Sequence, residues 1–165
     1  MKNYLYKIKA CGIGIAVLIA IADQLSKLWI NELVASNLLP LKILSFFNLV
    51  IVYNKGISFG MLSNSNIALI NIVLPIFLSF ITIFLLFWLL KSKEKLVIVA
   101  LGFIIGGATG NLIDRVFYGA VTDFLDFHIG YYHYPAFNIA DSAIFIGVAI
   151  IVITGFFDGK KNEQK

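Results

Sequence analysis

The sequence predicts an all-α membrane protein with four transmembrane helices and a small extracytoplasmic β-sheet. Of its 165 residues, 60% are hydrophobic and only 13% are charged, against roughly 25% charged in a soluble domain. Four segments satisfy or approach the roughly 20 mainly apolar residues that a span requires. The basic residues lie in small groups between these segments, which is typical of topology signals and excludes a nucleic-acid-binding surface.

The four predicted spans cover residues 10–30, 67–90, 96–117 and 137–157 of a single domain, residues 1–165. Lysines precede the first span, fill the turn between the second and third, and follow the fourth. The positive-inside rule therefore places both termini in the cytoplasm. The basic N-terminus followed by Ala20-Ile21-Ala22 also resembles a cleaved secretory signal peptide. Apolar residues continue as far as Ile30, which favours a retained span.

The connections 31–66 and 118–136 must then face outward. Residues 46–53 are aromatic and β-branched and predict a strand, and residues 121–127 have a similar pattern. Tyr131, Tyr132 and Tyr134 form an aromatic cluster in the second connection. We expect a small sheet on the outer leaflet, with its aromatic side chains at the membrane interface.

Ionisable side chains inside the spans are candidates for function, because each costs about 2.5–3.5 kcal/mol near the centre of a span. Asp23 and Lys27 are four residues apart and share a helix face. The alternative is a structural ion pair near the outer membrane surface.

The third span carries glycines at every fourth position, which predict a groove where another helix packs closely. Close packing does not explain the polar residues that follow this groove at the outer end of the span. The glycines are Gly102, Gly106 and Gly110, and the polar residues are Asn111, Asp114 and Arg115.

Two further carboxylates are predicted at the outer boundary. Asn138 is a good N-cap for the fourth helix and places Asp141 at its third position, where the alternative is a carboxylate that only completes the cap. Asp123 lies in an apolar outer segment at the same membrane height. Two carboxyl groups about 3 Å apart in a poorly solvated site share one proton, so one acts as a base and the other as an acid. Asp126 faces the other side of an extended segment and is expected to be solvated or structural.

Other chemistries are less well supported. His128 and His133 lack a clear third ligand for a zinc site. The sequence has no Gly-x-Ser-x-Gly nucleophile elbow and no phosphate-binding glycine loop. We therefore expect neither a metal nor another cofactor.

Five separated motifs resemble those of the lipoprotein signal peptidases, also called signal peptidase II. They read Asp-Gln-Leu-Ser-Lys at 23–27, Asn-Lys-Gly-Ile-Ser-Phe-Gly at 54–60, Gly-Gly-Ala-Thr-Gly-Asn-Leu-Ile-Asp-Arg at 106–115, Val-Thr-Asp-Phe at 121–124 and Phe-Asn-Ile-Ala-Asp at 137–141. Thr109 stands where an aliphatic residue is expected, at a packing position.

The resemblance implies an aspartic endopeptidase of the bacterial inner membrane, with its active site toward the outer face. Its catalytic residues would be Asp123 and Asp141. The residues implied to shape or support the site are Asp23, Lys27, Asn54, Gly56, Asn111, Asp114, Arg115, Asn138 and Ala140.

The implied substrate is a prolipoprotein with a diacylglyceryl-modified cysteine, cut immediately before that cysteine. The implied partners are this substrate and membrane lipids, and a monomer is the expected state. One alternative is a small proton- or cation-coupled transporter, which predicts inverted repeats and midplane charges. Another is a non-catalytic membrane subunit, which leaves the paired carboxylates unexplained.

Overall fold

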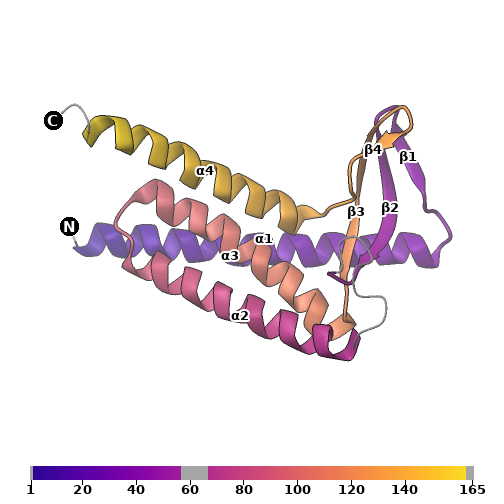
Figure 1. Ribbon diagram of the computed structural model, residues 1–165, viewed down its shortest axis with the longest axis horizontal. Coiled ribbons are helices and arrows are strands. Elements are labelled where there is room, and N and C mark those ends of the chain that lie inside the picture. Colours follow the sequence, from indigo (N-terminus) through magenta and orange to yellow (C-terminus); the bar gives the residue numbers. More distant parts are fainter. Residues whose placement is uncertain (1, 57–66, 163–165) are drawn as a thin grey trace.

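The computed structural model describes residues 2–56 and 67–162, which form four long helices and a four-stranded sheet (Figure 1). The helices are α1 (Lys2–Ala35), α2 (Ile67–Lys91), α3 (Lys95–Tyr118) and α4 (Ile139–Asn162). Each contains a segment long and apolar enough to cross a membrane. The predicted fold class is confirmed, and each predicted span falls on one helix, apart from residues 137 and 138.

Helix α1 extends beyond its predicted span at both ends, because the polar residues that flank the apolar run also accept a helical backbone. Its 34 residues reach about 50 Å at 1.5 Å per residue, more than the roughly 30 Å of a bilayer core. The helix ends where Asn37 adopts a left-handed backbone, with φ 56°. There the amide of Leu38 donates to the carbonyl of Leu33 at 3.0 Å, as in a Schellman motif.

Helix α3 lies at the centre of the bundle and packs against each of the other three helices. Its glycines make this packing possible. A Cβ atom on Gly106 would lie only 2.7 Å from the carbonyl oxygen of Ala16, and one on Gly102 would lie 2.5 Å from that of Gly12. The predicted glycine groove therefore receives α1 of the same chain.

The sheet is antiparallel, with the order β1-β2-β3-β4. Its strands are β1 (Leu41–Leu44), β2 (Phe47–Asn54), β3 (Val121–Ile129) and β4 (Tyr132–His133). Strands β2 and β3 match the two predicted strands to within two residues at each end. Strands β1 and β4 are short and were not predicted individually. Ile30 of α1 packs with Leu49 and Phe124, which joins the sheet to the bundle.

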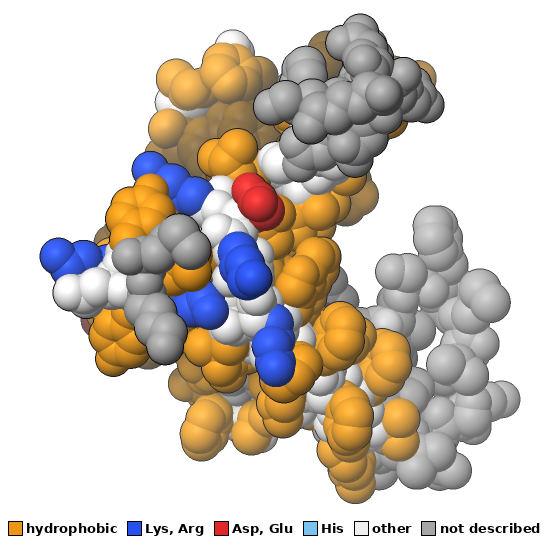
Figure 2. All heavy atoms as spheres, turned by 90° about the vertical axis from the view of Figure 1, so that its left-hand side faces the viewer, with side chains coloured by type: hydrophobic (Ala, Val, Ile, Leu, Met, Phe, Trp, Pro, Cys, Tyr) orange, Lys and Arg blue, Asp and Glu red, His pale blue; other side chains and the backbone are white. Residues whose placement is uncertain are grey.

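The two ends of the bundle differ in chemistry. Both chain ends and the connection between α2 and α3 lie at one end, whereas the sheet lies at the other (Figure 1). Figure 2 views the molecule from the end without the sheet and shows basic side chains gathered there among apolar ones. This end includes Lys91, which ends α2, and Lys95, which begins α3. The lysines of the connection between α2 and α3 therefore lie at the opposite end of the bundle from the sheet.

Candidate active site

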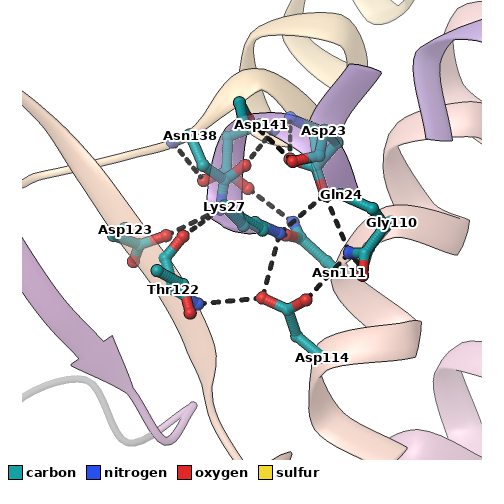
Figure 3. A network of polar contacts seen from close by, with 12 residues as sticks. Asp23, Gln24, Lys27, Gly110, Asn111, Asp114, Thr122, Asp123, Asn138 and Asp141 are labelled. Atoms are coloured by element: carbon teal, nitrogen blue, oxygen red, sulfur yellow. Dashed lines mark hydrogen bonds and ion pairs between the residues drawn. The ribbon is translucent and has the colours of Figure 1, made fainter. Parts of the chain in front are cut away.

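A cluster of buried polar side chains lies where α1, α3 and α4 meet the sheet (Figure 3). Asp123 contributes from β3 and Asp141 from α4, so the two predicted carboxylates come to the same site. Asn138 connects them. Its side-chain amide donates to Oδ1 of Asp123 at 2.7 Å, and its backbone N–H donates to Oδ2 of Asp141 at 3.2 Å.

Asp141 is fixed by the start of α4. The backbone N–H of Asp141 donates to Oδ1 of Asn138 at 2.9 Å, while the Asp141 carboxylate accepts the backbone N–H of Asn138. This reciprocal pair is the arrangement of a capping box, and it confirms the predicted N-cap. The helix begins at Ile139 because Phe137 is still paired with Leu125 of β3. The local fold thus fixes the direction of the Asp141 side chain.

Asp123 is fixed by the neighbouring strand. The residue is 2% exposed, and its Oδ2 accepts a hydrogen bond from the side-chain amide of Asn54 at 3.1 Å. Without an irregularity, Asn54 would share a face with Asn48, six residues earlier, because strand side chains alternate. The register of β2 against β3 shifts between Leu49 and Val52. This bulge adds one residue and turns Asn54 onto the face of Asp123.

Three asparagine side chains surround the two carboxylates. The oxygen of each asparagine amide accepts a hydrogen bond, and this bond orients the amide. Gly56 donates its N–H to Oδ1 of Asn54 at 2.9 Å, from a left-handed backbone with φ 78°. Lys27 donates to Oδ1 of Asn111 at 3.1 Å. The backbone N–H of Asp141 donates to Oδ1 of Asn138. The three NH₂ groups therefore point toward the carboxylates, and that of Asn111 reaches Oδ1 of Asp141 at 2.7 Å.

These surroundings make Asp123 hard to ionise. Burial raises the pKa of its carboxyl group, and the nearby charge of Asp141 adds to the effect. Hydrogen bonds from Asn54 and Asn138 and the charge of Lys27 act in the opposite direction. The net result is a pKa raised from 3.8 to about 6. The site can thus hold a proton on one carboxyl group in mildly acidic to near-neutral water.

The predicted ion pair between Asp23 and Lys27 is present at 2.7 Å and belongs to the buried polar cluster. Lys27 also lies 3.1 Å from Asp114 of α3. All three side chains are buried. Ala140 is small enough for its backbone to approach α3 closely, where Gly107 has no side chain to obstruct it.

Arg115 has free hydrogen-bonding capacity beside the carboxylates. Its Nη1 donates a long bond of 3.4 Å to the carbonyl of Asn111. Its Nε is buried and has no hydrogen-bond partner in the described part of the chain. A guanidinium group in this position can donate to a carbonyl group brought into the site.

Sequence reasoning missed two members of this cluster. Gln24 donates to Oδ1 of Asp114 at 2.9 Å and to the carbonyl of Gly110 at 3.1 Å. Thr122 contributes its backbone, with its N–H bound to Asp114 at 3.0 Å. A polar glutamine beside Asp23 inside an apolar span was a signal for the first. No sequence signal marks a backbone amide.

Asp126 lies outside the cluster, as predicted from strand alternation, and it is structural. It is buried and accepts hydrogen bonds from Asn48 at 3.0 Å and from His133 at 2.7 Å. Desolvation opposes its ionisation, but the bonds from His133 and Asn48 outweigh it and lower the pKa of Asp126. Residues 57–60 of the predicted motif at 54–60 lie outside the described residues.

Comparison with known proteins gives one family. Residues 15–157 match the family model described as Signal peptidase (SPase) II. The lipoprotein signal peptidase of Francisella tularensis subsp. tularensis (strain SCHU S4 / Schu 4) is 43% identical over 153 residues, which cover 90% of this chain and 92% of the relative. That of Shewanella sp. (strain MR-4) is 44% identical over 159 residues, covering 92% and 89%.

Two solved structures are similar throughout. One is a bacterial membrane enzyme determined by the in meso method at 2.3 Å resolution, with a TM-score of 0.73 and 31% identity, covering 94% of this chain and 93% of that one. The other is a bacterial membrane enzyme determined in the same way at 1.9 Å, with a TM-score of 0.69 and 32% identity, covering 88% and 92%. The four helices and these neighbours identify a multi-pass membrane protein.

Proposed function

Because the chain belongs to the signal peptidase II family, we propose that it is an aspartic endopeptidase that removes signal peptides from lipid-modified prolipoproteins. One observation carries this proposal: Asp123 and Asp141, from separate elements, are joined through Asn138. The substrate's diacylglyceryl group keeps the scissile bond near the membrane surface. The two aspartates lie at the sheet end of the bundle, so they are at the same height in the membrane as the scissile bond of such a substrate.

In the proposed reaction, one carboxyl group is ionised and the other is protonated. The ionised group takes a proton from water as the water oxygen attacks the carbonyl carbon before the lipidated cysteine, and the protonated group gives its proton to the carbonyl oxygen. As the tetrahedral diol collapses, the C–N bond breaks and the cysteine nitrogen receives the proton that the first carboxyl group took from water. One hydroxyl group of the diol gives its proton back to the other carboxylate and becomes part of the product carboxyl group. The pair again holds one proton, and no covalent enzyme intermediate forms.

The side chains around the pair have separate roles in this proposal. Arg115 and the amides of Asn111 and Asn54 position the peptide backbone. Asn54 is exposed at the end of β2, where a substrate can reach it. The raised pKa of Asp123 implies that kcat/KM falls as the pH rises above about 6 in the free enzyme.

We propose the orientation of the protein in the membrane from the positions of its lysines. The end of the bundle that contains Lys91 and Lys95 faces the cytoplasm, together with both termini. The sheet and the carboxylates then face the outer side of the bacterial inner membrane. The glycine groove is filled by α1 of the same chain, so we propose a monomer.

The test uses purified protein in lipid or detergent, with a diacylglyceryl-modified precursor and its unlipidated form. We expect cleavage of the lipidated precursor alone. Asp123→Asn and Asp141→Asn should fold but not cut, because an amide cannot exchange the proton. Asp126→Asn is the matched control: it removes a buried carboxylate from the other face of the same strand and should still cut. Cleavage at the normal rate by either dyad variant would show that the catalytic assignment is wrong.

A further inference from the structure

Lys27 is a buried cation with all three of its N–H groups in use. The side chain is 4% exposed. Its Nζ lies 2.7 Å from Oδ2 of Asp23, 3.1 Å from Oδ2 of Asp114 and 3.1 Å from Oδ1 of Asn111 (Figure 3). An ammonium group has three donors, so this environment uses its full capacity. A lysine held in this way cannot move without disturbing α3 and its own helix.

The two carboxylates beside Lys27 each hold one further backbone amide. Oδ1 of Asp23 accepts the N–H of Ala140 at 3.0 Å. Oδ2 of Asp114 accepts the N–H of Thr122 at 3.0 Å. Ala140 immediately precedes Asp141, and Thr122 immediately precedes Asp123. The same cation is therefore connected, through one carboxylate on each side, to the backbone of the residue that precedes each member of the pair.

We propose that Lys27 is a positioning residue that sets the relative placement of Asp123 and Asp141. This inference rests on the proposed function. Asp23 and Asp114 carry like charges in a buried space and would repel each other without the cation between them. Lys27 attracts both carboxylates and keeps them close together. The backbone segments that are bound to these carboxylates, and that carry the catalytic aspartates, are then held close together as well. Its third bond orients Asn111, which donates to Asp141.

Lys27 also acts on Asp123 through its charge. The charged groups that act on Asp123 are Lys27 on α1, Arg115 on α3 and Asp141 on α4. Asp23 and Asp114 lie beside Lys27. Without the cation, Asp123 ionises less readily. Removal of Lys27 should therefore move the falling limb of the kcat/KM profile to higher pH, which a merely structural role would not do.

The experiment compares Lys27→Met with wild type and with Lys7→Met, which replaces an exposed lysine of the same helix. Methionine retains an unbranched apolar stem without the charge. We expect kcat of Lys27→Met to fall on the order of 100-fold, as for a misplaced reacting group. KM should change far less than kcat, because Asn111 is the one proposed substrate contact that Lys27 orients, and the falling limb should move upward. Lys7→Met should behave as wild type.

The outcomes separate this inference from the proposed function. If wild type does not cut the lipidated precursor, the proposed function fails. If wild type cuts and folded Lys27→Met keeps the wild-type kcat, or changes only KM, the positioning role is overturned. Should Lys27→Met not fold, Asp114→Asn decides, because it keeps the side-chain size, removes the charge that faces Lys27 and leaves one acceptor oxygen for the donors of Gln24, Lys27 and Thr122. A loss of about tenfold in kcat at constant KM supports the inference, and an unchanged kcat overturns it.

Discussion

Replacing Asp123 by asparagine should change how the stability of the protein depends on pH. The pKa of Asp123 is raised in the folded state from 3.8 to about 6, chiefly by burial. In the unfolded chain the same carboxyl group ionises at its ordinary value. The folded protein therefore holds this proton more tightly than the unfolded chain does. The stability associated with that proton is fully present below pH 3.8 and is lost as the pH rises through about 6.

The size of the effect follows from the two pKa values. Each pKa unit between the folded and unfolded states corresponds to about 1.4 kcal/mol, so the rise from 3.8 to about 6 corresponds to about 3 kcal/mol. Asparagine does not titrate. The stability of Asp123→Asn relative to wild type should therefore increase by about 3 kcal/mol between pH 3.5 and pH 7. Contacts that the asparagine amide gains or loses add a constant to the difference in the free energy of unfolding between the two proteins, and this constant does not change with pH.

The assay is reversible unfolding in mixed micelles at a series of pH values, followed by tryptophan fluorescence. Asp126→Asn is a control with the opposite sign, because the pKa of Asp126 is lowered in the folded state. Wild type should gain stability over that variant as the pH rises through the acidic range. A difference between Asp123→Asn and wild type that stays flat from pH 3.5 to 7 would refute the reasoning. Asp123 would then ionise as freely as in the unfolded chain, and the pair would not share a proton.

Three other predictions follow from the same structure. Gly106→Ala should lower the free energy of unfolding by about 1–3 kcal/mol, because its Cβ would lie 2.7 Å from the carbonyl oxygen of Ala16; Gly14→Ala, with nothing within 4 Å, should not destabilise the protein. Asn54→Ala removes a hydrogen bond that lowers the pKa of Asp123, so the falling limb of kcat/KM should move to higher pH. The rate of precursor cleavage should be unchanged by EDTA, since the proposed mechanism uses carboxyl groups and water alone.

The sequence was most informative where local chemistry decides the structure. Apolar runs predicted the four helices because a bilayer span requires a minimum length. The N-cap at Asn138 was predictable because its bonds are made within four residues, and the structure confirms it. Strand alternation correctly separated Asp126 from Asp123, since the side-chain period does not depend on distant contacts.

Features that depend on pairing between distant segments were not predictable from the residues alone. The bulge in β2 appears only when this strand is aligned with β3, yet it determines which face Asn54 occupies. The bond from Asp23 to the amide of Ala140 joins residues 117 positions apart. Gln24 was overlooked as a site member because its partners lie on α3.

The placement of Asp141 on the last helix also affects when activity can begin during synthesis. A ribosome-bound chain that ends before residue 138 already contains Asp123, Lys27 and the glycines of α3. It lacks the second carboxylate and the asparagine that joins it to the first. On the proposed mechanism, a partly inserted chain is therefore an inactive precursor, and no separate propeptide is required to keep it so. The same mechanism implies that proteolysis begins only after α4 has entered the membrane and packed against α3.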